Sequence, residues 1–394
     1  MISLETSVLG MKFENPFLLA SAPPTASIES IDKAFSMGWA GAVLKTITPD
    51  DFEMFETSPR YAVMRNKDKI IGFQNIELLN KKSVKYWYDG INYLKKKYPA
   101  KIIIASIMAP VQKQKWQDLV IKLNETPVDA YELNFSCPHG MPEKGLGMAI
   151  GTNSEISAKI TKWVKEVSKV PVFVKLSPNV TDVTEIVKAV EKAGADGLAA
   201  INTVQGFLGI NLDTLEPNLN VDGYSTYGGL SGEIVKPIGL RIVSQIRQTS
   251  NLPVLGMGGI STWQDAVQYI AAGSDVVQIC TEVMLNGFKI IDELKKGLLN
   301  YLENKNIDNI LKLKNVAVTK ITSYEQLNKN YKLFPKTDAT KCVKCGKCIE
   351  LCFENEGNAL SKDNAGNVVL NKDKCLNCSL CKLVCPKQAI TMSI

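Results

Sequence analysis

The sequence predicts an α/β protein: a closed (β/α)8 barrel followed by a small, cysteine-rich α+β module. Short apolar runs alternate with longer amphipathic stretches from residue 17 to about residue 280. Polar side chains or glycines follow most of these runs, and eight of the ten cysteines lie between Cys342 and Cys385. A chain of 394 residues can bury one large core and still carry a small appended module.

The apolar runs are interpreted as strands because they are short and rich in β-branched residues. The stretches between them, such as Ser154–Val167 and Val183–Lys192, have helical periodicity. Eight strands with helices between them favour a closed TIM barrel over an open doubly wound sheet. The predicted strands are Phe17–Ala20, Gly41–Leu44, Ile102–Ala105, Tyr131–Asn134, Val172–Lys175, Gly197–Ala200, Pro253–Gly256 and Asp275–Gln278.

Changes in composition divide the chain into three parts. Residues 1–300 form the expected barrel. Residues 301–335, rich in Leu, Lys and Asn, are expected to connect it to the module at 336–394. The module contains an internal repeat of its cysteine motif, which predicts an approximate twofold arrangement.

The charge balance favours a small-molecule partner. Lys plus Arg number 46 against 40 Asp plus Glu, and the surplus of +6 is spread along the chain rather than forming a nucleic-acid-binding stripe. No apolar run approaches the ~18 residues of a membrane span, and the start of the chain lacks basic residues. We therefore expect a cytoplasmic protein whose clustered cysteines are reduced metal ligands.

The cysteine spacing predicts two 4Fe–4S clusters. The pattern C-x2-C-x2-C-x3-C occurs twice, as in bacterial ferredoxins, where the fourth cysteine of each run binds the other cluster. Two structural zinc sites are the alternative, but zinc usually takes pairs of cysteines separated by a longer insert. Phe353 replaces the proline that often follows the fourth cysteine. The predicted ligand sets are Cys342, Cys345, Cys348 and Cys385 for one cluster, and Cys375, Cys378, Cys381 and Cys352 for the other.

Polar residues that follow the apolar runs mark the candidate active site, because barrel enzymes place their sites where the strands end. Any one of them could be an ordinary solvated residue, but their coincidence favours function. The set contains Ser21, Lys45, Thr46, Asn75, Glu77, Asn134, Ser136, Cys137, Lys175, Asn202 and Thr203.

Glycine-rich turns in the second half of the barrel suggest a phosphate site. They occur in Tyr227–Gly232 and Gly256–Ile260, and Cys280–Thr281 follows the last strand. Backbone N–H groups at such turns can bind a phosphate, and barrels often hold one beside strands seven and eight. FMN fits this arrangement better than a dinucleotide does.

Several motifs make nearly the whole chain similar to the catalytic part of the dihydropyrimidine dehydrogenase family. The broader relative is dihydroorotate dehydrogenase, which shares the FMN barrel and a related cysteine loop. The resemblance implies hydride transfer from reduced FMN to C6 of uracil or thymine, with Cys137 giving a proton to C5. The motifs are Gly72–Glu77, Asn134–Met141, Pro178–Asp182, Ala200–Thr203, Thr226–Gly232 and the two cysteine runs.

The resemblance also suggests roles for the polar set. A pyrimidine ring presents two N–H donors and two carbonyl acceptors, and carboxamides can pair with both kinds. The lysines would lie along the flavin and stabilise its anionic reduced form. The expected substrate residues are Asn75, Glu77, Asn134, Asn202 and Thr203. The expected FMN residues are Ser21, Lys45, Thr46, Lys175, Gly232, Gly258, Gly259 and Thr281.

Cys137 is the expected proton donor. A lone cysteine is commonly a small buried hydrophobe, but Pro138 and the glycines after it argue against burial. A thiol with a reference pKa of ~8.5 is mostly protonated at neutral pH, which suits an acid. His139, the only histidine, could tune this site or simply form the loop. Cys280 is interpreted as core.

Two other functions remain open. A dihydroorotate dehydrogenase would bind anionic orotate, which Glu77 should repel. A non-catalytic electron-transfer subunit is the second alternative, against which the intact Cys137 and asparagine set weigh.

The sequence contains no motif typical of a site that binds NADH or NADPH. No G-x-G-x-x-G turn opens a helix after a strand. The family resemblance implies that FAD and NAD(P)H are carried by a partner flavoprotein subunit. An oligomer is also expected, because ferredoxin-like modules often dock on a neighbouring subunit.

Overall fold

The computed structural model describes residues 2–52, 56–79, 81–135 and 147–394. The chain divides into two compact units, Met1–Ile321 and Thr322–Ile394. Residues 301–321, within the segment expected to be a connector, therefore belong to the first unit. Within the described ranges, no helix is long and apolar enough to cross a membrane.

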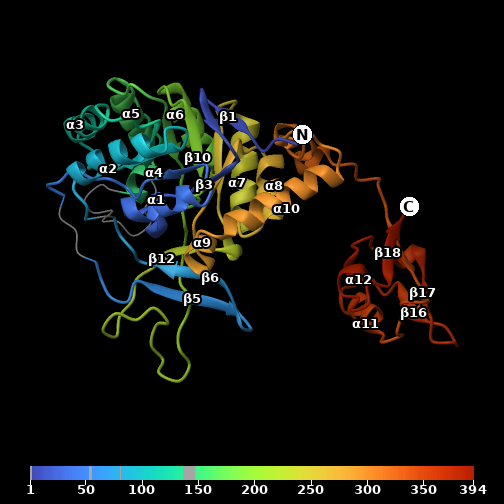
Figure 1. Cartoon of the computed structure of the whole chain (residues 1–394). Helices are drawn as coiled ribbons and strands as arrows, with labels where there is room; N and C mark the ends of the chain where they lie inside the picture. Colours follow the sequence, from blue (N-terminus) through green and yellow to red (C-terminus); the bar gives the residue numbers. More distant parts are fainter. Residues whose placement is uncertain (1, 53–55, 80, 136–146) are drawn as a thin grey trace. The chain divides into compact units, whose positions relative to one another are not determined.

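The first unit is a closed barrel of eight parallel strands, which confirms the predicted fold (Figure 1). Each predicted apolar run corresponds to one barrel strand. Strands buried on both faces read as continuous apolar runs, which is why the sequence identified them. In order around the barrel they are β3 (Phe17–Leu19), β4 (Gly41–Val43), β7 (Ile102–Ile107), β8 (Ala130–Asn134), β9 (Val172–Lys175), β10 (Gly197–Ala200), β13 (Val254–Met257) and β14 (Val276–Ile279).

Helices surround the barrel (Figure 1), and they contribute buried apolar residues to the same core cluster as the strands. In α6 (Val183–Lys192) the buried residues recur at helical spacing, and Asp182 caps the helix by accepting from the Thr184 N–H. This helix and α5 (Ser154–Lys165) match the two helices expected from periodicity. The other helices described in the first unit are α1 (Ile28–Ser36), α2 (Val84–Lys97), α3 (Lys113–Leu123), α4 (Met148–Gly151), α7 (Lys236–Thr249), α8 (Trp263–Ala271), α9 (Thr281–Asn286) and α10 (Ile290–Asn304).

A short N-terminal hairpin packs with the barrel's interior side chains. It consists of β1 (Thr6–Val8) and β2 (Met11–Phe13), which pair antiparallel. Val8, Met11 and Phe13 join one apolar cluster with inward side chains such as Leu18 and Phe173. Residues at and beyond the C-terminal ends of the barrel strands line a polar cavity instead.

An antiparallel sheet that the sequence did not reveal is inserted after two barrel strands. Its order is β11-β12-β6-β5, with β5 and β6 following β4 in the chain, and β11 and β12 following β10. The insertions place this accessory sheet beside the C-terminal ends of the barrel strands, as Figure 1 shows. Its members are β5 (Tyr61–Asn66), β6 (Lys69–Asn75), β11 (Val204–Gly206) and β12 (Gly228–Ser231).

Glycines allow the accessory sheet to approach the barrel turns closely. A Cβ on Gly72 would lie 2.6 Å from the Ser231 carbonyl oxygen, and one on Gly232 would lie 2.7 Å from the Gly72 Cα. A Cβ on Gly259, in the turn after β13, would lie 2.6 Å from the Gly232 carbonyl oxygen. No side chain fits at these contacts, so three separate segments meet backbone to backbone.

The second unit is a small α+β module with two antiparallel strand pairs. Strand β15 (Phe334–Thr337) pairs with β18 (Ile390–Ser393), and β16 (Leu360–Lys362) pairs with β17 (Val368–Leu370). Each cysteine run leads into a helix, α11 (Lys347–Glu354) in the first run and α12 (Leu380–Leu383) in the second. The equivalent placement of the two helices agrees with the internal repeat in the sequence.

Candidate functional site

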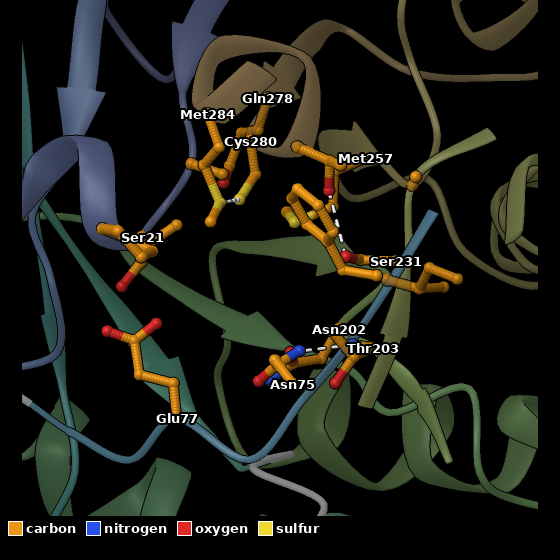
Figure 2. Close-up of a pocket in the computed structure, with 18 of the residues that line it drawn as sticks. Ser21, Asn75, Glu77, Asn202, Thr203, Ser231, Met257, Gln278, Cys280 and Met284 are labelled. Carbon is orange, nitrogen blue, oxygen red and sulfur yellow. Dashed lines mark hydrogen bonds between the residues drawn. The ribbon is translucent and has the colours of Figure 1, made fainter. Parts of the chain in front are cut away.

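One large cavity lies at the C-terminal ends of the barrel strands, beside the accessory sheet (Figure 2). Its volume is about 1120 Å³, including the part open to solvent. Every predicted substrate and FMN residue that the structure describes lines this cavity. Cys137, Ser136 and His139 lie outside the described residues.

Asn75 and Glu77 reach the cavity from the accessory sheet, and not from a barrel strand as the sequence interpretation assumed. Asn75 ends β6, and its Nδ2 donates to the Gly229 carbonyl of β12 over 2.9 Å. A Cβ on Gly229 would lie only 2.2 Å from the Thr203 Oγ1, so this glycine lets Asn75 and Thr203 come together. Figure 2 shows Asn75 beside Asn202 and Thr203.

A hydrogen-bonded network fixes the polar groups at the strand ends. Asn134 Nδ2 donates to Thr46 Oγ1 over 2.9 Å, and Asn202 Nδ2 donates to Asn134 Oδ1 over 3.4 Å. Thr46 Oγ1 also lies 3.0 Å from Ser106 Oγ and 3.3 Å from Ser21 Oγ. The side chains therefore hold one another in place before any ligand binds. The sequence interpretation missed Ser106, because it lies within the apolar strand β7.

Two buried lysine–glutamate pairs carry the charges of the cavity region. Lys45 Nζ lies 3.2 Å from Glu77 Oε1, and Lys175 Nζ lies 3.3 Å from Glu132 Oε1. Glu132 is fully buried in β8, and Gln278 Nε2 donates to its other oxygen over 2.8 Å. Pairing offsets the large cost of burying each charge. Glu132 lies two residues before Asn134 and so points to the same face of the strand.

Glu77 has two further partners that the sequence did not suggest. Tyr61, on β5, donates to Glu77 Oε2, and Arg60 Nη1 lies 3.8 Å from Glu77 Oε1. The carboxylate is therefore shared between Lys45 and Arg60. Its repulsion of an anionic ligand is weaker than the sequence argument assumed, because neighbouring cations compensate the charge.

The glycine turns form a backbone cradle in the lining of the cavity. Gly232 and Gly259 have positive φ values of 91° and 72°, which L-residues rarely adopt. Thr281 Oγ1 donates to Ser231 Oγ over 3.0 Å, which joins the start of α9 to the end of β12. Without side chains, these turns present their backbone to the cavity.

Asp265 stabilises this cradle by binding the turn that follows β13. Its Oδ2 accepts from the backbone N–H groups of Ser261 and Thr262, at 3.0 and 2.9 Å, and its Oδ1 pairs with Lys236 at 2.6 Å. Burial raises the pKa of Asp265, but the Lys236 bond and the bonds from Ser261 and Thr262 outweigh burial and lower the pKa below its usual value. The carboxylate thus holds the turn between β13 and α8.

Cys280 belongs to the cavity wall, although the sequence interpretation assigned it to the core. Its Sγ lies 3.7 Å from Met284 Sδ (Figure 2). Burial raises the pKa of Cys280 to about 11, so it is a neutral thiol at physiological pH.

The module contains two smaller cavities, each lined by four cysteines. The sets correspond to the crossed pattern of the spacing argument. The first cavity is lined by Cys342, Cys345, Cys348 and Cys385, and the second by Cys352, Cys375, Cys378 and Cys381.

Comparisons with known proteins agree with this architecture. Residues 3–302 match the family model described as dihydroorotate dehydrogenase, and residues 336–392 match the model described as a 4Fe–4S dicluster domain. The chain therefore belongs to the class of iron–sulfur flavoprotein oxidoreductases built on a (β/α)8 barrel.

The similar proteins narrow the class. The chain is 36% identical to "Dihydropyrimidine dehydrogenase (NADP(+)), chloroplastic" of Arabidopsis thaliana, over 84% of this chain and 80% of the relative. It is 35% identical to "NAD-dependent dihydropyrimidine dehydrogenase subunit PreA" of Escherichia coli (strain K12), over 91% and 87%. It is also 35% identical to "Dihydroorotate dehydrogenase B (NAD(+)), catalytic subunit" of Pyrococcus abyssi, over 80% and 99%. The chain is a member of the dihydropyrimidine dehydrogenase family, related to the dihydroorotate dehydrogenases.

The lowered pKa of Asp265 leads to a pH-dependent stability prediction. Its stabilisation is fully present above the unfolded-state pKa of about 3.9 and is lost as the pH falls through the lower folded-state value. In urea unfolding at pH 7, Asp265→Asn should lower the free energy of unfolding by about 1–2 kcal/mol, because it removes the charge-assisted bonds. The difference from wild type should shrink as the pH falls from about 5 to about 2.

The matched control is Asp118→Asn, since Asp118 is exposed on α3 and bonded only to Gln114 among the described contacts. It should have little effect at any pH. A deficit in Asp265→Asn that stays constant across the pH range would contradict the role assigned to the carboxylate.

Proposed function

We propose that this oxidoreductase reduces uracil or thymine to the 5,6-dihydropyrimidine, with FMN in the barrel cavity and two 4Fe–4S clusters in the module. The observation that carries the proposal is a single cavity in which amides, a threonine, two lysines and glycine turns converge. The Escherichia coli dihydropyrimidine dehydrogenase relative aligns over 91% of the chain, which is more than the 335 of 394 residues that precede the cysteine module. Its similarity therefore extends into that module.

The lining of the cavity fits FMN. The backbone cradle has the shape and chemistry for a terminal phosphate, and Lys45 and Lys175 supply cations for a flavin ring. Bound FMN would supply a hydride for C6 of the pyrimidine. The residues proposed to hold it are Ser21, Lys45, Thr46, Lys175, Gly232, Gly258, Gly259 and Thr281.

The substrate side consists of the amide cluster and Glu77. Asn75, Asn202 and Thr203 lie together, and their carboxamides can meet both the donors and the acceptors of a pyrimidine edge. Asn134 supports Asn202 through their hydrogen bond. Glu77, from the other side, would accept from a ring N–H.

A protonated cysteine is the proposed general acid for C5. Cys137 lies three residues after Asn134 in the same sequence motif, and the family resemblance gives it this role. The buried Cys280 is a poor substitute, because a pKa of about 11 makes its proton hard to give up. Cys137 would transfer its proton and then regain one from solvent.

The cysteine cavities fit 4Fe–4S clusters. Each presents four thiols, and a Cβ on Gly357 would lie 2.7 Å from Cys352 Sγ, so this glycine leaves room for the sulfur. The Ala389 N–H donates to Cys385 Sγ over 3.2 Å, and the Ala359 N–H to Cys352 Sγ over 3.5 Å. Such bonds to cluster sulfurs are a usual means of tuning potential.

A partner flavoprotein completes the proposal. Iron–sulfur clusters accept single electrons, whereas NADH and NADPH deliver two electrons as a hydride. A second flavin must therefore take up the hydride and pass its electrons on one at a time. The Escherichia coli relative is named as a subunit of an NAD-dependent enzyme. We therefore place FAD and NAD(P)H on a separate chain that passes electrons to the module.

Orotate reduction is the second candidate. The dihydroorotate dehydrogenase model covers the barrel, and Arg60 and Lys45 beside Glu77 would lessen the repulsion of the orotate carboxylate. The relative from Pyrococcus abyssi, however, is covered over 99% by 315 aligned residues, fewer than the first unit alone contains. The presence of the cysteine module in this chain therefore favours dihydropyrimidine dehydrogenase over dihydroorotate dehydrogenase.

The partner requirement predicts the donor specificity of the isolated chain. Under anaerobic conditions the purified holoprotein should reduce uracil or thymine with reduced methyl viologen, and it should show no turnover with NADH or NADPH. The assay follows dihydropyrimidine formation by chromatography. Sustained nicotinamide-dependent turnover by the homogeneous chain would rule out the partner.

The proposed acid predicts a specific loss in Cys137→Ala. Turnover with the artificial donor should fall by ~10²–10⁴-fold, the usual contribution of a positioned general acid, while flavin and iron contents stay unchanged. Cys280→Ala is the matched thiol control and should retain far more activity. Near-normal turnover of Cys137→Ala would remove this residue from the mechanism.

A further inference from the structure

Tyr61 is a cavity residue with no role in the proposed chemistry. It begins β5 and is the direct cross-strand partner of Asn75 on β6. Residues directly opposite each other in an antiparallel pair have their side chains on the same face of the sheet. Tyr61 and Asn75 both line the cavity.

The Tyr61 hydroxyl is bonded to the one carboxylate on the substrate side of the cavity lining that the structure describes. It donates to Glu77 Oε2, while Lys45 pairs with Glu77 Oε1 at 3.2 Å. Burial, followed by the bond to Glu77, raises the pKa of Tyr61, so the hydroxyl keeps its proton and remains a donor. The ring is held beside Phe73, with the ring centroids 6.1 Å apart.

These contacts determine how Glu77 can meet a ligand. A carboxylate offers about four lone-pair positions, two on each oxygen. Tyr61 and Lys45 bind different oxygens of Glu77, so together they fix the plane of the carboxylate. Loss of the hydroxyl would remove a contact at Oε2 while Lys45 and the more distant Arg60 stay at Oε1.

We propose that Tyr61 is a positioning residue for substrate: it orients Glu77 so that the carboxylate accepts a pyrimidine N–H. The inference rests on the proposed function, because it takes the ligand of Glu77 to be a pyrimidine. It predicts that Tyr61 acts on pyrimidine affinity through Glu77 and leaves the flavin and the clusters untouched.

The test is a double-mutant cycle on the holoprotein. Uracil and thymine affinities are measured by titration of the flavin absorbance for wild type, Tyr61→Phe, Glu77→Gln and the double variant. Tyr61→Phe keeps the ring and its packing, and should weaken binding about tenfold through loss of one charge-assisted bond. In the Glu77→Gln background, the same change should have an effect of less than about twofold, because residues that act as a unit are not additive.

The control is Tyr93→Phe. Tyr93 also donates to a carboxylate, Asp32, at 2.7 Å, but on the exposed surface between α2 and α1. It should leave pyrimidine affinity unchanged, and flavin content should be the same in all variants.

Three results would overturn the inference. Unchanged affinity in Tyr61→Phe, with wild type binding pyrimidines normally, refutes the role of Tyr61 alone. An equal loss in both Glu77 backgrounds shows that Tyr61 does not act through Glu77. Failure of wild-type holoprotein to bind either pyrimidine refutes the proposed function, and the inference falls with it.

Discussion

The cavity depends on a backbone contact between three segments far apart in the sequence. Gly72 of β6, Gly232 after β12 and Gly259 after β13 meet at distances that leave no room for a Cβ. This contact holds the accessory sheet against the barrel turns. The same sheet carries Asn75 and Tyr61 into the cavity lining, which also contains Gly232 and Gly259. A single packing contact thus connects the backbone cradle with the residues proposed to bind substrate.

Charge compensation is the second constraint on the site. Lys45 pairs with Glu77 and Lys175 with Glu132, all four largely buried. An isolated buried charge would be costly, so each cation of the cavity brings a carboxylate with it. The pairs differ in their surroundings. Glu132 is enclosed in the barrel and held by Gln278, whereas Glu77 lies at the accessory sheet, where Tyr61 and Arg60 also reach it.

The sequence predicted the barrel well because its signal is local. Each strand is a continuous apolar run such as Ile102–Ala105, and several polar residues of the site, such as Lys45 and Asn202, closely follow such runs. The two cysteine groups were likewise encoded in fixed short spacings. These features need only a few neighbouring residues to be read.

The accessory sheet could not be predicted in this way. Its central pairing joins Asn75 to Gly229, more than 150 positions apart, and no short pattern marks that contact. Tyr61 and Arg60 lie in a polar stretch that resembles an ordinary loop. Glu132 was overlooked inside an apolar run, although its position two residues before Asn134 places both side chains on one face. Long-range packing, rather than local propensity, created these parts of the site.

Reoxidation of the reduced flavin tests the central claim most directly. The holoprotein is photoreduced under anaerobic conditions, and uracil, thymine and orotate are added separately while the flavin absorbance is followed. The account predicts rapid return of the oxidised flavin spectrum with uracil or thymine, with formation of the dihydropyrimidine, and a flavin that stays reduced with orotate. Reoxidation by orotate alone, or by none of the three, would contradict it.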